Sequence, residues 1–130
     1  MGQRILIDTN AAIDYLVGRL PQNGAALIGQ LINTKQANIS IIVQIELLSY
    51  NPPNPNDLRM VEDFVQKCNI LPLTDEIAKR TYLLRRQRRR KLPDSVIAAT
   101  ALEHQMELLT HNISDFNNIN GLTVIDPHTI

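Results

Sequence analysis

The 130-residue sequence has no tryptophan, one cysteine and no apolar run long enough to cross a membrane. A single cysteine, Cys68, excludes an intramolecular disulfide and a cysteine metal cluster, which favours a reducing compartment. The first residues, 1–4, lead directly into a short apolar run and lack the basic, apolar and small-residue order of a signal peptide. These absences predict a soluble, cytoplasmic protein with no membrane partner.

The sequence also has no net charge, since 13 basic residues balance 13 acidic ones. The charges are nevertheless segregated. Eight of the 13 basic residues lie between Lys79 and Lys91, and no acid interrupts them. The overall balance therefore says little about binding partners, and the basic segment has to be considered by itself.

What the sequence has is enough apolar residues, 44%, to build the core of one domain spanning residues 1–130. Short apolar runs alternate with longer segments in which apolar residues recur every three or four positions, as in helices with one buried face. This alternation predicts βα units and a mostly parallel sheet. The expected strands are 4–8, 37–42, 70–73, 107–110 and 122–125, and the expected helical segments include 25–32 and 58–68.

Three further segments carry local signals. The three prolines in Tyr50–Asn56 predict an exposed loop. Thr74 followed by Asp75 and Glu76 predicts a capped helix that runs into the basic segment. Residues 95–102 are apolar or small almost all round, which predicts a buried helix with Asp94 at its mouth.

Four acids occupy positions from which they could converge. Asp8 follows the first expected strand, Glu46 lies in the first turns of a helix expected to start near Ile42, and Asp94 lies in a first helical turn. Asp115 follows the strand run that ends at Thr110. In an open parallel sheet, ligands bind beyond the carboxyl ends of the strands, so these positions can share one edge.

Converging carboxylates would require a cation. Two carboxylates about 5 Å apart repel by roughly 3 kcal/mol at an effective dielectric near 20, so three or four could not all stay ionised alone. Mg²⁺ or Mn²⁺ suits them, because both ions prefer oxygen ligands, and a held ion can activate water against a phosphodiester. Each acid singly also fits a plain structural role: Asp8 and Asp94 as helix caps or helix-start residues, Asp115 as a turn former, Glu46 as a solvated helical residue.

The joint pattern resembles the PIN-domain family and, within it, the VapC-like toxins of bacterial toxin–antitoxin systems. The matching pieces occur in family order and span nearly the whole chain. They are Ile5-Leu6-Ile7-Asp8-Thr9-Asn10, Ser40 to Leu48 around Glu46, Lys91 to Ala101 around Asp94, and Leu109-Thr110-His111-Asn112-Ile113-Ser114-Asp115-Phe116. Ser95 stands where alanine is common, and Val43-Gln44 stands where threonine or serine is often seen.

The resemblance implies a three-layer α/β/α domain with a central, mostly parallel sheet of about five strands. It also implies an endoribonuclease that uses Mg²⁺ or Mn²⁺, restrained by a small antitoxin and assembled as a homodimer. Asp8, Glu46, Asp94 and Asp115 would be the catalytic and metal-binding acids. Thr9, Asn10, Thr110 and Asn112 would support them by hydrogen bonds to the carboxylates or to a bound water.

The basic segment directly precedes Asp94. Arg85, Arg86, Arg89, Arg90 and Lys91 could hold the phosphates of an RNA strand, or could simply favour the dipole at a helix end. The histidines His104, His111 and His128 lack the spacing of a zinc site. His111 is the one nearest the acids, and we interpret it as a loop histidine rather than a general base.

Three functional hypotheses therefore remain open. The first is a metal-dependent endoribonuclease that acts as the toxin of a toxin–antitoxin pair. The second is a PIN-like RNA-binding or interaction module without activity. The third is a PIN nuclease that acts in RNA processing or on structured DNA without an antitoxin.

Overall fold

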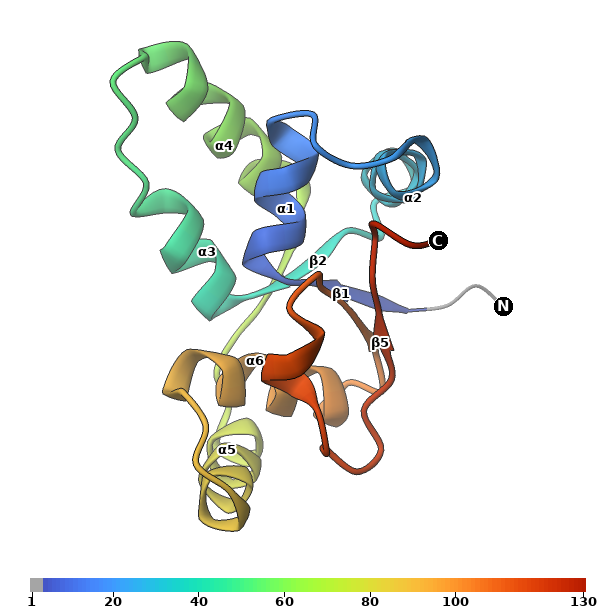
Figure 1. The fold of residues 1–130 in the computed structure, drawn as a ribbon. Coiled ribbons are helices and arrows are strands. Elements are labelled where there is room, and N and C mark those ends of the chain that lie inside the picture. Colours follow the sequence, from blue (N-terminus) through green and yellow to red (C-terminus); the bar gives the residue numbers. More distant parts are fainter. Residues whose placement is uncertain (1–3) are drawn as a thin grey trace.

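The computed structural model describes residues 4–130, and its centre is a sheet of five parallel strands in the order β3-β2-β1-β4-β5 (Figure 1). Residues 1–3, part of the segment without a signal-peptide pattern, lie outside the described residues. The strands are β1 (Ile5–Ile7), β2 (Asn38–Ser40), β3 (Asn69–Leu71), β4 (Glu107–Leu109) and β5 (Val124–Ile125).

The strand order reverses at β1. The chain passes from β1 to β2 and β3 on one side, then crosses to β4 and β5 on the other. The crevice outside the carboxyl ends of the strands at such a reversal is where open parallel sheets bind ligands. Because Asp8 follows β1 and Thr110 follows β4, these two residues flank that crevice.

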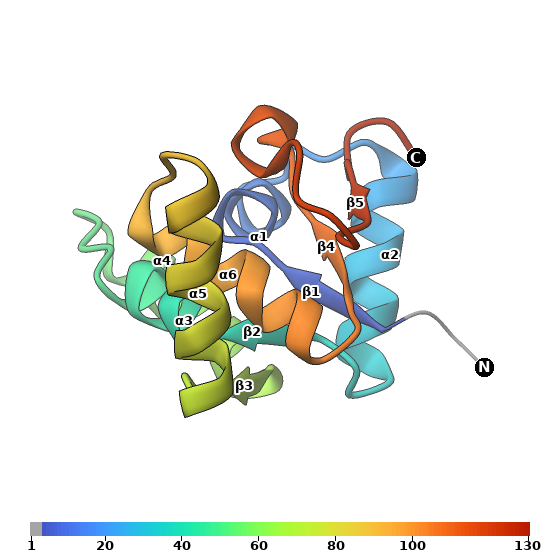
Figure 2. The ribbon, with the colours of Figure 1, turned by 90° about the horizontal axis from the view of Figure 1, so that it is seen from below.

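Helices cover both faces of the sheet, as the predicted three-layer architecture requires. Figures 1 and 2 show α1 and α2 on one side of the sheet and α5 and α6 on the other. The helices are α1 (Thr9–Leu16), α2 (Gln22–Asn33), α3 (Ile41–Leu48), α4 (Pro55–Lys67), α5 (Asp75–Gln87) and α6 (Leu92–Glu103), with a short 3₁₀ helix, η1 (Ile113–Phe116). No helix within residues 4–130 is both long and apolar enough to cross a membrane.

Two predicted helices are confirmed together with the reasons given for them. The Thr74 hydroxyl accepts a hydrogen bond from the Ile77 amide at 3.2 Å, so this side chain caps α5 as expected. In α6, all residues from Ser95 to Ala101 are buried. Asp94, half-buried, therefore stands at the entrance of a helix that runs through the core.

Two predicted boundaries differ from the observed ones because of capping. The second strand ends at Ser40 rather than continuing through Ile42, since the Ser40 hydroxyl accepts the Val43 amide at 3.2 Å and starts α3 there. The expected loop Tyr50–Asn56 ends early because Pro55 begins α4, where a missing amide hydrogen is tolerated. Asn54 supplies the cap, accepting the Asn56 amide at 2.9 Å.

Candidate active site

The four predicted acids lie around the carboxyl edge of the sheet. Asp8 joins β1 to α1 and caps that helix, and Glu46 lies within α3, which follows β2. Asp94 lies in the first turn of α6, and Asp115 lies in η1, which follows β4. Asp8 is only 5% exposed, Asp94 is half-buried, and Glu46 and Asp115 are exposed. The site is therefore open to solvent on one side and closed at Asp8.

The Asp8 carboxylate is held by three donors. Its Oδ1 accepts the Thr9 amide at 2.9 Å, and its Oδ2 accepts both Asn10 Nδ2 and the Thr110 hydroxyl at 2.7 Å each. A carboxylate oxygen has about two acceptor positions. Oδ2 is therefore filled, while Oδ1 accepts only one donor from residues 4–130 and can bind a cation through its second lone pair.

The Thr110 hydroxyl has its full set of partners. It donates to Asp8 Oδ2 and accepts Asn10 Nδ2 at 3.0 Å and the Asn112 amide at 3.1 Å. With both acceptor positions occupied, its single hydrogen has to point at Asp8. Thr110 is fully buried, so this arrangement is rigid, and its hydroxyl joins Asn10 and the Asn112 amide to the Asp8 carboxylate.

Replacing Thr110 with valine is expected to lower the free energy of unfolding by about 1–3 kcal/mol, because a buried network is left without its central hydroxyl. Thr110→Ser keeps that hydroxyl and should stay within about 1 kcal/mol of the wild type. Urea denaturation at pH 7.5 with a chelator measures both values. If valine were tolerated as well as serine, the hydroxyl would have no role in holding Asp8.

Thr9, the fourth supporting residue, links Asp8 to Glu46. Its amide donates to Asp8 Oδ1, and its hydroxyl donates to Glu46 Oε1 at 2.6 Å. An O–H donor at this distance from a carboxylate oxygen makes a strong, charge-assisted bond. The first turn of α1 and the helix α3 therefore place Glu46 beside Asp8.

The acids also act on one another electrostatically. The pKa of Asp94 is raised to about 6, chiefly by burial and also by the charges of Asp115, Asp8 and Glu46, while Lys91 opposes the shift. Burial likewise raises the pKa of Asp8, and Glu46 adds to this, although hydrogen bonds from Thr110, Thr9 and Asn10 counteract it. Because the other three acids all destabilise the charged form of Asp94, the four carboxylates share one region of negative potential.

The donor set fits a hard divalent ion. All four side chains offer carboxylate oxygens, Asp8 Oδ1 can bind a cation through its second lone pair, and the charged form of Asp94 lacks compensation. Across residues 4–130, no three His, Cys, Asp or Glu side chains stand in a geometry that could hold a metal ion. Repulsion between carboxylates opposes their closer approach when no cation lies between them.

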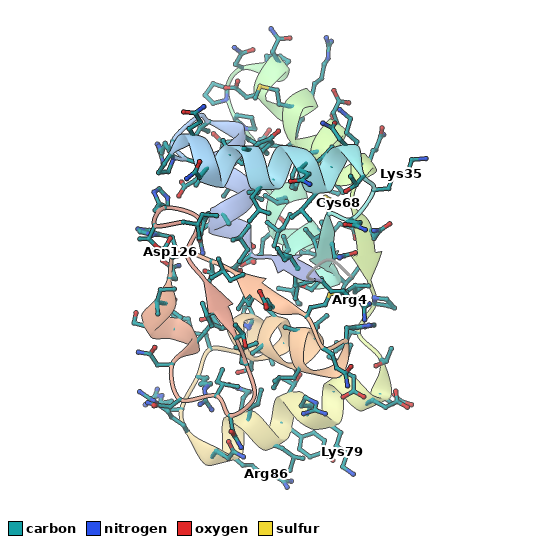
Figure 3. All side chains as sticks on the ribbon, turned by 90° about the vertical axis from the view of Figure 1, so that its right-hand side faces the viewer. Arg4, Lys35, Cys68, Lys79, Arg86 and Asp126 are labelled. Carbon is teal, nitrogen blue, oxygen red and sulfur yellow. The ribbon has the colours of Figure 1, made fainter. Side chains whose placement is uncertain are left out.

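The basic segment borders the acids directly. A cavity of about 210 Å³ is lined by residues of both, and a larger cavity of about 640 Å³ lies next to it, since Arg88, Arg89 and Arg90 line both. The smaller cavity is also lined by Lys91, Asp94, Ser114, Asp115 and Asn117, and the larger by Tyr82, Arg85, Arg86 and Gln87. Figure 3 shows Arg86 on α5 at the outer surface of the molecule.

The arginines of this segment differ in their surroundings. Arg90 is half-buried and donates to the carbonyl oxygens of Leu84 at 2.7 Å and Asn118 at 3.2 Å, so it fastens the segment to the domain. Arg86 lies over the Tyr82 ring, 4.9 Å from its centroid. Within residues 4–130, Arg86, Arg88 and Arg89 form no ion pair with a carboxylate. Arg85 and Lys91 are likewise exposed and without an ion pair in the described residues, so these five residues are cations available to a ligand.

A second polar cluster lies next to the acids, and the sequence motifs did not predict it. The His111 ring bonds Asp126, and the His128 ring bonds Asp14 of α1. Burial raises the pKa of Asp126, but hydrogen bonds from the His128 amide and the His111 ring, with the charges of both histidines, outweigh it and hold this pKa below its usual value. No sequence spacing indicates this cluster, because its members come together only in the folded chain.

The fold agrees with comparisons to known proteins. A model of the PIN domain matches residues 5–122, so the chain belongs to the PIN-domain family, a family of nucleases. The predicted resemblance is thereby confirmed. A comparison with curated protein sequences gives no match.

Solved structures extend this similarity to VapC-like PIN domains. A chain in a toxin–antitoxin complex from Klebsiella pneumoniae is 31% identical, with a TM-score of 0.74 over 97% of this chain and 99% of that one. A chain in the structure of VapBC-1 from nontypeable Haemophilus influenzae is 26% identical, with a TM-score of 0.75 over 95% of this chain and 97% of that one. DNA-bound VapBC from Salmonella typhimurium shares the fold, with a TM-score of 0.80 at 22% identity over 97% and 99%.

Proposed function

We propose that the protein is a metal-dependent endoribonuclease and the toxin of a toxin–antitoxin pair. The observation that carries the proposal is the shared field of the four acids, in which Asp115, Asp8 and Glu46 all raise the pKa of Asp94. Such an arrangement is unfavourable for the fold alone, and perturbed carboxylates in a cleft are typical of functional sites. Membership of the PIN-domain family supports the same conclusion.

Asp8, Asp94, Asp115 and Glu46 would hold Mg²⁺ or Mn²⁺. When bound, such an ion would supply an acidified water as nucleophile and stabilise charge on the phosphodiester. Thr110, Asn10 and Thr9 orient the Asp8 and Glu46 carboxylates through the hydrogen bonds described above. The three donors to Asp8 also limit its rotation and leave Oδ1 as the oxygen with the fewer donors.

The basic segment would position the substrate. Arg88 and Arg89 line the smaller cavity together with Asp94 and Asp115. They also line the larger cavity, together with Arg86. A phosphate backbone crossing this surface would be held next to the acids by charge, with little selectivity for bases. The substrate class we infer is RNA with an accessible single strand.

A protein partner is supported by the solved relatives and by the surface. The Klebsiella pneumoniae relative comes from a toxin–antitoxin complex. An apolar cavity of about 410 Å³ opens between α1, α3 and α4, and exposed apolar surface of this kind marks interaction sites. Its lining includes Ile13, Leu16, Val17, Leu47, Tyr50, Met60 and Val61. This surface is available to a small antitoxin or to a second copy in a homodimer.

The proposal is tested by incubating purified protein with mixed RNA and with DNA, in Mn²⁺ or in a chelator. We expect RNA cleavage in Mn²⁺ only. The protein should be unfolded and refolded first, so that a co-purified inhibitor is removed. An absence of cleavage would favour the RNA-binding module, and cleavage of structured DNA in preference to RNA would favour the third hypothesis.

The toxin role has its own test. Expression of the chain is expected to arrest growth, and co-expression of the product of the neighbouring gene should restore it. RNA cleavage without growth arrest, or arrest that the neighbour does not relieve, would instead point to a nuclease of RNA processing.

A further inference from the structure

The chain folds back beyond β5, and residues 126–130, here called the 126–130 turn, pack against α1 and α2. The Thr129 amide donates to the Asp126 carbonyl oxygen at 3.1 Å and closes the turn. Pro127 is buried against Gly24 of α2, where an added Cβ would lie 2.0 Å from the Pro127 oxygen. Only glycine permits this approach. The turn is therefore a tightly fitted part of the domain.

Asp126 connects this turn to the loop after β4. Its Oδ1 accepts the His128 amide at 2.9 Å, and its carboxylate contacts the His111 ring Nδ1 at 3.1 and 3.2 Å. The His128 ring Nε2 contacts Asp14 Oδ2 of α1 at 2.8 Å, and the two rings lie 4.1 Å apart. Figure 3 shows Asp126 where the chain beyond β5 passes close to the blue helices. The loop after β4 is thus tied to α1 through this turn.

The loop after β4 in turn orients the residues that hold Asp8. The His111 amide donates to Asn10 Oδ1 at 2.9 Å. This bond determines which end of the Asn10 amide faces inward, so that Nδ2 donates to Asp8 and to Thr110. A displaced His111 backbone would release Asn10 and reduce the donors that hold Asp8 Oδ2.

We propose that Asp126 is a positioning residue for the Asp8 cluster and acts through His111, the backbone after β4 and the Asn10 amide. The inference rests on the proposed function, since it concerns the affinity of the acids for a divalent ion. The route consists of three hydrogen bonds: between Asp126 and the His111 ring, from the His111 amide to Asn10 Oδ1, and from Asn10 Nδ2 to Asp8 Oδ2. The His111 side chain is 52% exposed, so it adds little to the packing of the core.

The test compares Asp126→Ala, His111→Ala and the double variant with the wild type. Mn²⁺ affinity is measured by calorimetry, and the Asn10 side-chain amide is followed by NMR in metal-free protein. Each single variant should bind Mn²⁺ about 3- to 10-fold more weakly, less than the 10- to 100-fold loss typical of partners that touch metal ligands. The double variant should be no weaker than the singles, because both remove the same connection.

Two further variants separate positioning from stability. Asp126→Asn keeps an acceptor oxygen and should restore Mn²⁺ affinity to within about twofold of the wild type. Asn23→Ala removes the bond from Asn23 Nδ2 to the Ile130 carbonyl oxygen, 3.3 Å, and so loosens the same turn without touching His111. It should leave the Asn10 amide signals and Mn²⁺ affinity unchanged.

An unchanged Asn10 amide signal and Mn²⁺ affinity in Asp126→Ala would overturn the inference, as would an equal loss in Asn23→Ala. If Asp126→Ala does not fold, His111→Ala decides alone, because its exposed ring can be removed with little effect on the core. A wild type that binds no Mn²⁺ would refute the proposed function. The Asn10 amide signals would still decide whether Asp126 positions the cluster.

Discussion

Replacing Asp94 with asparagine should reduce Mn²⁺-dependent RNA cleavage by at least about 100-fold. Removing a hydrogen-bond partner of a metal ligand typically lowers activity 10- to 100-fold, and removing an acid that would itself bind the metal should cost more. Asparagine has nearly the same shape as aspartate, so the entrance of α6 can remain intact. The measurement is the initial rate of RNA cleavage in Mn²⁺ at saturating protein. Asp63→Asn, which changes an exposed acid on α4, is the matched control and should cleave like the wild type.

The same substitution should stabilise the metal-free protein. With a folded pKa of about 6 against an ordinary value of 3.8, Asp94 is more easily protonated in the folded than in the unfolded state. Stability should therefore fall as the pH rises from about 4 to 6, and the penalty is fully present above pH 6. The shift corresponds to about 3 kcal/mol, which screening at a half-buried side chain reduces to about 1 kcal/mol.

Asp94→Asn should consequently melt about 3–5 °C higher than the wild type at pH 7.5 in chelator, with a smaller gain at pH 4.5. Asp8, whose pKa is also raised, contributes a pH dependence of the same sign that remains in the variant. Scanning calorimetry at the two pH values gives both numbers. A variant that lost both activity and stability would indicate a structural role for Asp94, and equal cleavage by the two proteins would refute the assigned site.

The positions nearest the strand ends could be predicted because local signals determine them. Asp8 follows an apolar run that ends at the sheet edge, and Thr110 follows another, so the parallel arrangement alone brings them together. Asp94 was placed by the unusually apolar helix behind it. Glu46 was less certain from sequence, since it is an exposed helical residue, and the Thr9 hydroxyl bond that joins it to Asp8 is visible only in the folded chain.

The remaining features depend on tertiary contacts that leave no local pattern. Asp14 and His128 are joined across 114 positions of sequence. The role of Arg90 is hidden for another reason, since it stands in a run of chemically identical side chains. Only its bonds to the carbonyl oxygens of Leu84 in α5 and of Asn118 distinguish it from Arg88 and Arg89.

RNA binding by the basic segment can therefore be tested without disturbing Arg90. Replacing Arg86, Arg88 and Arg89 with glutamine should weaken binding of single-stranded RNA by about 100-fold at 0.1 M salt, if each residue contacts one phosphate. The slope of log affinity against log salt should become shallower by about 2, since each lost contact to a single strand removes about 0.7. Arg90 is left unchanged because its bonds hold the segment in place.

The comparison protein carries Lys35, Arg59 and Lys67 replaced by glutamine, which changes the net charge equally. Figure 3 shows Lys35 far from Arg86, and all three replaced residues are exposed. Affinities are measured by fluorescence anisotropy in chelator, with Asp94→Asn as the background so that no strand is cut. A general charge effect would weaken both triple variants alike. If the arginines hold RNA phosphates beside the acids, only the arginine variant should lose affinity and salt dependence. An unchanged slope in that variant would show that the arginines do not contact phosphates and act only at the end of α5.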